Sequence, residues 1–177
     1  MSARTRALQQ MATAGFIGSA GDVLVQRYER PQLTLTHVDT ARTARVATYR
    51  VLQAPLLHIF WSHFDVWATT LRLSGGRAVA FKVVCDQALC SPFFNVSFYA
   101  SQSSLEGRSL HECCKRVMAG FWPTWLAGFQ YYGAVHCFTF SIIPPAYRIA
   151  WNSVAAVLWT AYLSHSNQTL ISPTSNS

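Results

Sequence analysis

The sequence predicts an all-α integral membrane protein, a helical bundle of four spanning helices plus an amino-terminal helix that spans the membrane or lies at its interface. Hydrophobic residues make up 51% of the 177 residues and charged residues only 12%, about half the ~25% of soluble proteins. The apolar residues gather into stretches near the ~20 residues that cross a bilayer core. Arginines at the ends of these stretches supply most of the net charge of +7 and match no nucleic-acid-binding motif. The expected partner is therefore the lipid bilayer and not nucleic acid.

The amino-terminal segment has two interpretations. Residues 1–21 contain no acidic residue, which is typical of a mitochondrial targeting segment. The alternative is an uncleaved helix over residues 8–26, on which Ala14, Gly18 and Asp22 form a stripe that lets another helix approach closely. The run continues without a break past Asp22, which favours the helix, and both interpretations can hold together.

The second helix is expected over residues 42–71. Asp39 precedes it and is a plausible N-cap, and Pro55 is expected to kink or break it near the middle. His58 and His63 lie in this helix, but a spacing of five does not place them on one face. They are therefore interpreted as hydrogen-bonding groups inside the bundle rather than as metal ligands.

The third helix, over residues 78–99, contains a cation and an anion in an apolar run. Lys82 and Asp86 are four residues apart and share one helical face, with Gln87 beside them. Ionisable groups at membrane depth are costly and usually face a bundle interior or a water-filled cavity. The pair is therefore either an internally neutralised lock between helices or the polar lining of a pathway. Pro92 is expected to kink this helix.

Two further spans are predicted over residues 117–140 and 146–163. The last span carries Arg148 and Asn152 four residues apart. The basic residues before the second helix and after the third fall on one side of the membrane, which the positive-inside tendency assigns to the cytosol or the organelle matrix.

The chain is expected to form one unit without a cofactor. Residues 1–164 are predicted to be a single helical membrane domain and residues 165–177 a polar, disordered tail. The 5 cysteines are an odd number and contain no Cys-x-x-Cys pair, so they are interpreted as free thiols. No cluster with metal-ligand spacing and no phosphate-binding glycine loop is present.

Several motifs follow one another between residues 8 and 164. They are Gly21-Asp22-Val23-Leu24-Val25-Gln26, Asp39-x-x-Arg42-Thr43-x-Arg45, Ala54-Pro55-x-x-His58, Lys82-x-x-x-Asp86-Gln87-x-x-x-x-Pro92, and Tyr147-Arg148 followed by Trp159-x-x-Tyr162-Leu163-Ser164. In this order and spacing the chain resembles the Mpv/PMP family, named after the peroxisomal membrane protein of 22 kDa. That family contains small multi-span proteins of the inner mitochondrial and peroxisomal membranes.

The chain also departs from the family pattern. The family usually reads Trp-Pro-x-x-Gln-x-x-Asn-Phe before its last span, whereas this chain has Tyr132-Gly133-x-x-His136-x-x-Thr139-Phe140. If this stretch lines a pathway, the selectivity of relatives does not transfer to this chain.

The resemblance implies a channel or pore-like pathway for small solutes or ions that supports mitochondrial homeostasis. The residues themselves favour a pathway, because more polar side chains lie at apparent membrane depth than helix packing needs. These candidate intramembrane or pore-lining residues are Asp22, Gln26, His58, Lys82, Asp86, Gln87, Arg148 and Asn152.

The alternative function is a non-conducting structural or assembly protein whose buried charges fix helix packing. An enzyme is not expected, because no nucleophile with a believable base accompanies the polar residues. The arginine-rich, acid-free amino end favours the mitochondrial inner membrane, with the peroxisomal membrane as the alternative. A homo-oligomer is also compatible with the sequence.

Overall fold

The computed structural model describes residues 3–30, 38–141 and 148–171, and these are helical apart from short connections. The elements are α1 (Ala3–Glu29), α2 (Thr40–Thr70), α3 (Gly75–Cys85), the π-helical turn η2 (Asp86–Cys90), α4 (Ser91–Leu105), α5 (Leu110–Ser141) and α6 (Arg148–Ile171). The prediction of an all-α protein is confirmed.

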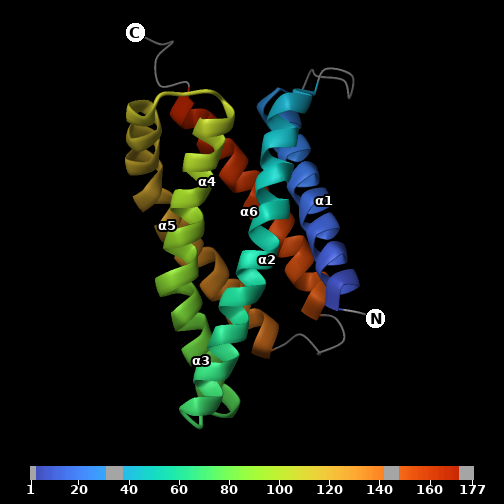
Figure 1. Ribbon diagram of the computed structural model, residues 1–177, viewed down its shortest axis with the longest axis vertical. Coiled ribbons are helices and arrows are strands. Elements are labelled where there is room, and N and C mark those ends of the chain that lie inside the picture. Colours follow the sequence, from blue (N-terminus) through green and yellow to red (C-terminus); the bar gives the residue numbers. More distant parts are fainter. Residues whose placement is uncertain (1–2, 31–37, 142–147, 172–177) are drawn as a thin grey trace.

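The helices are arranged as a closed ring (Figure 1). Helix α1 packs against α2 and α6, α2 also packs against α3 and α4, α4 packs against α5, and α5 packs against α6. The segments α3, η2 and α4 follow one another as one continuous rod. Because the last helix contacts the first, the ring encloses an interior.

Helix α2 begins as the sequence predicts, with a side-chain cap. Oδ1 of Asp39 accepts a hydrogen bond from the backbone N–H of Arg42 at 2.9 Å, and α2 starts at Thr40. Such a cap satisfies one of the backbone donors that the first turn of a helix leaves unpaired. Pro55 lies inside α2 without ending it. The predicted helix is thus confirmed within two residues at its start.

The third predicted helix is interrupted by η2, directly before Pro92. The backbone N–H of Ser91 donates to the carbonyl of Asp86, five residues earlier, which is the bond of a π-helical turn. Pro92 then occupies the first turn of α4, where a missing N–H costs nothing. The irregularity expected at Pro92 is therefore a widened turn, and the rod continues beyond it.

Helix α1 lies close to its two neighbours because glycines face them. A Cβ atom at Gly18 would lie 2.8 Å from Cγ of Arg50 on α2, and one at Gly21 would lie 2.9 Å from the carbonyl oxygen of Val157 on α6. Gly18 of the predicted stripe therefore does let α2 approach closely, whereas the contact with α6 depends on Gly21, which was not part of that stripe. The stripe also places Asp22, which is fully buried, where α1, α2 and α6 meet.

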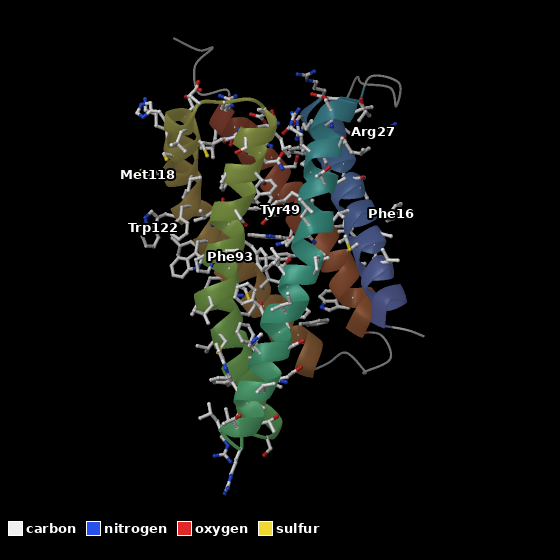
Figure 2. The ribbon with its side chains drawn as sticks, viewed as in Figure 1. Phe16, Arg27, Tyr49, Phe93, Met118 and Trp122 are labelled. Carbon is white, nitrogen blue, oxygen red and sulfur yellow. The ribbon has the colours of Figure 1, made fainter. Side chains whose placement is uncertain are left out.

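Aromatic residues fill the ring, and large apolar side chains also cover its outside. Tyr49, Phe98, Tyr99 and Leu163 form one buried cluster. On the outside, side chains such as Phe16, Met118 and Trp122 point away from the bundle (Figure 2) and are exposed. The molecule thus has apolar surface both inside and out.

Within the described residues, none of the helices combines the length and the apolar character that the hydropathy criterion for a membrane span requires. The number of spans therefore stays a prediction.

Helix α6 is longer than predicted. It continues to Ile171, so residues 165–171 of the predicted disordered tail are helical, while 172–177 lie outside the described residues. The physical reason is packing: Asn167 is buried, and Leu170 packs against the cluster that contains Tyr99. The prediction of disorder from residue 165 is wrong for this stretch.

Candidate functional site

Three polar groupings lie in the described part of the bundle. The first surrounds Asp22. Its carboxylate accepts hydrogen bonds from Nε2 of Gln26 at 2.7 Å, Nε of Arg42 at 2.8 Å, Oγ1 of Thr43 at 2.6 Å and Oγ of Ser164. These donors come from α1, α2 and α6. We call these five residues the Asp22 network; both oxygens of its carboxylate are paired, so it fixes three helices together.

Arg42 extends the Asp22 network to a second carboxylate. Its Nη1 lies 2.7 Å from Oε2 of Glu29, and Nδ1 of His165 lies 3.0 Å from Oε1 of the same carboxylate. The Oε1 of Gln26 accepts from the backbone N–H of Asp39 at 2.7 Å. Asp22 and Gln26, two of the predicted pore-lining residues, are thus part of a satisfied structural network.

The second grouping surrounds Glu106, where α4 ends. Its carboxylate lies 2.7 Å from Nη1 of Arg116, 2.8 Å from Nε of Arg108 and 3.8 Å from Nη2 of Arg45. Burial opposes ionisation of Glu106, but the hydrogen bonds from Arg116 and Arg108 outweigh it and hold the pKa of Glu106 below its ordinary 4.5. The arginines that the sequence assigns to one side of the membrane therefore gather around carboxylates.

Both groupings lie at one end of the ring, uppermost in Figure 1, where α1, α4 and α6 end and α2 and α5 begin. We call it the basic end. Helix α1 runs antiparallel to α2, so Ala3 lies at the opposite end of the bundle.

The third grouping lines a cavity of about 170 Å³ in the interior of the ring, which we call the central cavity. Its walls come from α2, η2, α4, α5 and α6. The charged and ionisable residues of the wall are Arg50, Asp86, Cys90, Tyr132 and His136. Gln87 and Asn95 add amide groups. A cavity so lined can hold a small polar molecule or an ion.

A second cavity, of about 270 Å³, lies beside the central cavity and is lined in part by Asp65 and Lys82. Trp61, Asp86 and His136 line both cavities. Nε1 of Trp61 donates a hydrogen bond of 2.9 Å to Oδ1 of Asp86. Asp86 therefore lies at the boundary between the two cavities.

The predicted pairing of Lys82 with Asp86 is wrong. Lys82 forms its ion pair with Asp65 of α2, and both side chains are substantially exposed, at 42% and 65%. Asp86 instead accepts a hydrogen bond from Trp61, which lies on α2 as Asp65 does. The i, i+4 spacing places both residues on one helical face, but α2 packs along α3 and offers each of them a different partner.

The structure brings together only some of the predicted site residues. Lys82, Asp86 and Gln87 line the cavities, whereas Asp22 and Gln26 belong to the Asp22 network. Three predicted residues have side chains outside the described part of the structure: His58, Arg148 and Asn152.

Sequence reasoning missed several residues of the central cavity. Tyr132 and His136 lie in the stretch that departs from the family pattern, which was a usable signal. Arg50 is a single cation within the apolar part of α2, a second signal. Asn95 follows Gln87 by eight residues, but an intervening π-helical turn hides that relation.

Metal ligation is a separate question. Among the residues that the structure describes, no three His, Cys, Asp or Glu side chains lie together as a metal site would need. Four cysteines with described side chains, Cys85, Cys90, Cys113 and Cys114, are free thiols.

Comparison with known proteins identifies relatives along most of the chain. The model of the Mpv17 / PMP22 family matches residues 103–164. "Protein SYM1" of Gibberella zeae is 30% identical over 160 residues, which cover 90% of this chain and 89% of the relative. "Mpv17-like protein" of Bos taurus is 32% identical over 155 residues, 88% of this chain and 74% of the relative.

A further relative is "Peroxisomal membrane protein 2" of Bos taurus, 26% identical over 161 residues, which cover 88% of this chain and 80% of the relative. No solved structure matches the chain. Identity of this level along nine-tenths of the chain confirms the resemblance seen in the motifs, and the expected location in an organelle membrane is confirmed with it. The chain therefore belongs to the Mpv17/PMP22 family and is a protein of an organelle membrane.

Proposed function

We propose that the chain forms a pathway for small solutes or ions through an organelle membrane, with the mitochondrial inner membrane as its location. One observation carries the proposal: two neighbouring cavities, each lined in part by ionisable side chains, share Trp61, Asp86 and His136 as lining residues. Ionisable residues at membrane depth usually mark a substrate or ion route, and here Asp86 and His136 line both cavities.

The dimensions of the bundle support this proposal. Helix α1 has 27 residues and α2 has 31, so each is roughly 40 Å or more long at 1.5 Å per residue, which exceeds a hydrocarbon core of about 30 Å. Exposed side chains such as Phe16, Met118 and Trp122 give the ring an apolar outer face that lipid would cover. In this proposal α1 spans the membrane beside the four other helical rods.

Single-channel recording in planar bilayers tests the pathway. The natural chain and Asp86→Asn are compared at matched incorporation. Removing the carboxylate from the boundary between the cavities is expected to shift the selectivity of a reproducible conductance from cations towards anions. Glu112→Gln, an exposed change at the start of α5, serves as the matched control and leaves selectivity unchanged.

Folded natural protein that shows no conductance at any voltage or pH contradicts the pathway. A conductance whose selectivity is identical in Asp86→Asn removes Asp86 from the route.

The second candidate is a non-conducting structural or assembly protein, and the basic end favours it. There the Asp22 network and the arginines around Glu106 hold the helices together without lining either cavity. The pair of Asp65 and Lys82 separates the candidates. Exchanging the two residues, Asp65→Lys with Lys82→Asp, keeps the ion pair and is tolerated by a purely structural protein, whereas in a pathway it alters selectivity.

The choice of organelle is tested by localisation of the chain with a tag at its carboxyl end. The acid-free residues 1–21 favour mitochondria. A peroxisomal pattern would assign the chain to the other membrane in which family relatives are named.

A further inference from the structure

Three residues that line the central cavity each carry a buried polar atom without a hydrogen-bond partner among the described residues. These atoms are Nε of Arg50, Oε1 of Gln87 and Oδ1 of Asn95. Gln87 and Asn95 are only 5% and 6% exposed. Buried polar groups are nearly always paired in native proteins, because an unpaired one loses its bonds to water without replacement. The walls of one cavity therefore carry a donor and two acceptors, which suit a polar molecule with groups of both kinds.

Two of these three side chains are already engaged through another atom. Nη1 of Arg50 donates to Oε1 of Gln53 at 2.6 Å, and Nδ2 of Asn95 donates to the backbone carbonyl of Phe121 at 3.0 Å. These bonds hold the two side chains in place. The stem of Arg50 also lies against Gly18 of α1, where a side chain would collide with it. Two of the three unpaired atoms thus belong to side chains that are already anchored.

The cavity wall also keeps its opposite charges apart. Arg50 comes from α2 and Asp86 from η2, and both line the central cavity. Among the side chains that the structure describes, no carboxylate forms an ion pair with Arg50. Asp86 is engaged by the indole of Trp61. The cavity therefore presents a cation on one wall and an anion on another.

We propose that the central cavity is a binding site for a small zwitterion that carries a carboxylate and an ammonium group. The carboxylate binds Arg50. The ammonium group donates to the amide oxygens of Gln87 and Asn95, next to the charge of Asp86. This inference rests on the proposed function and names the class of solute that the pathway selects.

The size and charge of the cavity favour a zwitterion over a simple anion or a simple cation. A cavity of about 170 Å³ is slightly larger than one of ~150 Å³ that holds benzene, so it suits a molecule of roughly six to ten non-hydrogen atoms, such as alanine or proline. A simple anion would leave both amide oxygens unpaired and lie near Asp86. A simple cation would leave Arg50 unpaired. A zwitterion offers a carboxylate to Arg50 and an ammonium group to the amide oxygens of Gln87 and Asn95.

Isothermal titration calorimetry on the full chain in lipid nanodiscs tests the site with alanine as the probe. Propionate and propylamine, which each lack one of the two charged groups, are the comparison ligands. Alanine is expected to bind saturably and more tightly than either. Arg50→Gln removes a hydrogen bond to a charged group and should weaken alanine binding by about 10- to 100-fold. Arg77→Gln, an exposed change at the start of α3, should leave it unchanged.

Two further variants keep the test decisive if Arg50→Gln does not fold. Arg50→Lys retains the charge and should bind alanine within about tenfold of the natural chain. Gln87→Met keeps the volume of the side chain but removes its acceptor, and it should bind alanine more weakly. Propionate binding as tight as alanine binding would overturn the proposal, and so would unchanged affinity in Gln87→Met.

The two proposals fail in different ways. Alanine binding without any conductance contradicts the pathway and leaves the site intact. Conductance without alanine binding contradicts the zwitterion site alone.

Discussion

The buried carboxylate of Asp22 joins three helices, α1, α2 and α6, through its hydrogen bonds. Its two oxygens accept four hydrogen bonds, and Arg42 provides the compensating charge. We expect Asp22→Asn to lower the free energy of unfolding by about 3–5 kcal/mol, because Arg42 would keep its buried position with part of its anionic partnership removed. Thermal or denaturant unfolding in detergent micelles measures the change.

The matched control is Asp65→Asn. Asp65 also forms an ion pair, with Lys82, but both side chains are substantially exposed. Exposed pairs contribute only about 0–1 kcal/mol to the free energy of unfolding. Equal losses of stability in the two variants would show that burial of the Asp22 network does not matter.

At the residue scale, the sequence was sufficient to locate buried polar groups and insufficient to pair them. Asp22, Gln26, Asp86 and Gln87 were singled out, and their side chains are at least partly buried. The predicted partner of Lys82, Asp86, was wrong, because helical spacing shows which residues share a face and not which neighbouring helix packs against that face. Asp65 could be recognised as that partner only once α2 was placed along α3.

At the element scale, close packing of α1 depends on the absence of side chains. A Cβ atom at Gly21 would lie 2.9 Å from a carbonyl oxygen and 3.0 Å from a backbone nitrogen of α6. We expect Gly21→Ala to destabilise the protein, because overpacking costs about 1–3 kcal/mol against a gain in helix propensity of at most ~1 kcal/mol. The midpoint of thermal unfolding should fall.

Gly133→Ala is the comparison for the same substitution in α5. A Cβ atom there meets nothing within 4 Å, so only the propensity gain remains and the unfolding midpoint should rise or stay constant. A rise in both variants would contradict the close approach of α1 to α6.

Element boundaries followed from local signals wherever those signals were recognised. The Asp39 cap placed the start of α2. The start of α5 has a comparable signal in Ser109 and Glu112: Oε2 of Glu112 accepts from the Ser109 N–H at 2.9 Å and from its hydroxyl at 2.7 Å, as in a capping box. The end of α6 had no such signal, because tertiary packing of Asn167 and Leu170 extends it.

At the scale of the whole molecule, Glu106 connects helices at the basic end and makes stability depend on pH. Its pKa in the folded protein lies below 4.5, so folding favours the ionised form. This stabilisation is fully present above the pKa of the unfolded chain and is lost as the pH falls from about 4.5 through the lower folded value. The difference in unfolding midpoint between the natural chain and Glu106→Gln should therefore be largest near neutral pH and shrink in acid.

A difference in unfolding midpoint between the natural chain and Glu106→Gln that stays constant across the same pH range would contradict this prediction. It would mean that Glu106 contributes through packing alone and that Arg108 and Arg116 do not depend on its charge.

The closed ring could not be predicted from the sequence. Helix number and the orientation of the basic loops follow from hydropathy and charge, but the contact between α1 and α6 joins segments that no local pattern relates. The central cavity arises from that closure, and this explains why Arg50 and Asn95 were missed while their helices were found.

Closure of the ring also sets an order of events during synthesis. Asp22 and its partner Ser164 are 142 residues apart, which at about 5–20 residues per second separates their emergence by roughly 7–30 s. Through that interval Asp22 has only the partners that α1 and α2 supply. The interior acquires its last wall only when α6 emerges, so the central cavity is enclosed only after every other helix of the ring has been made.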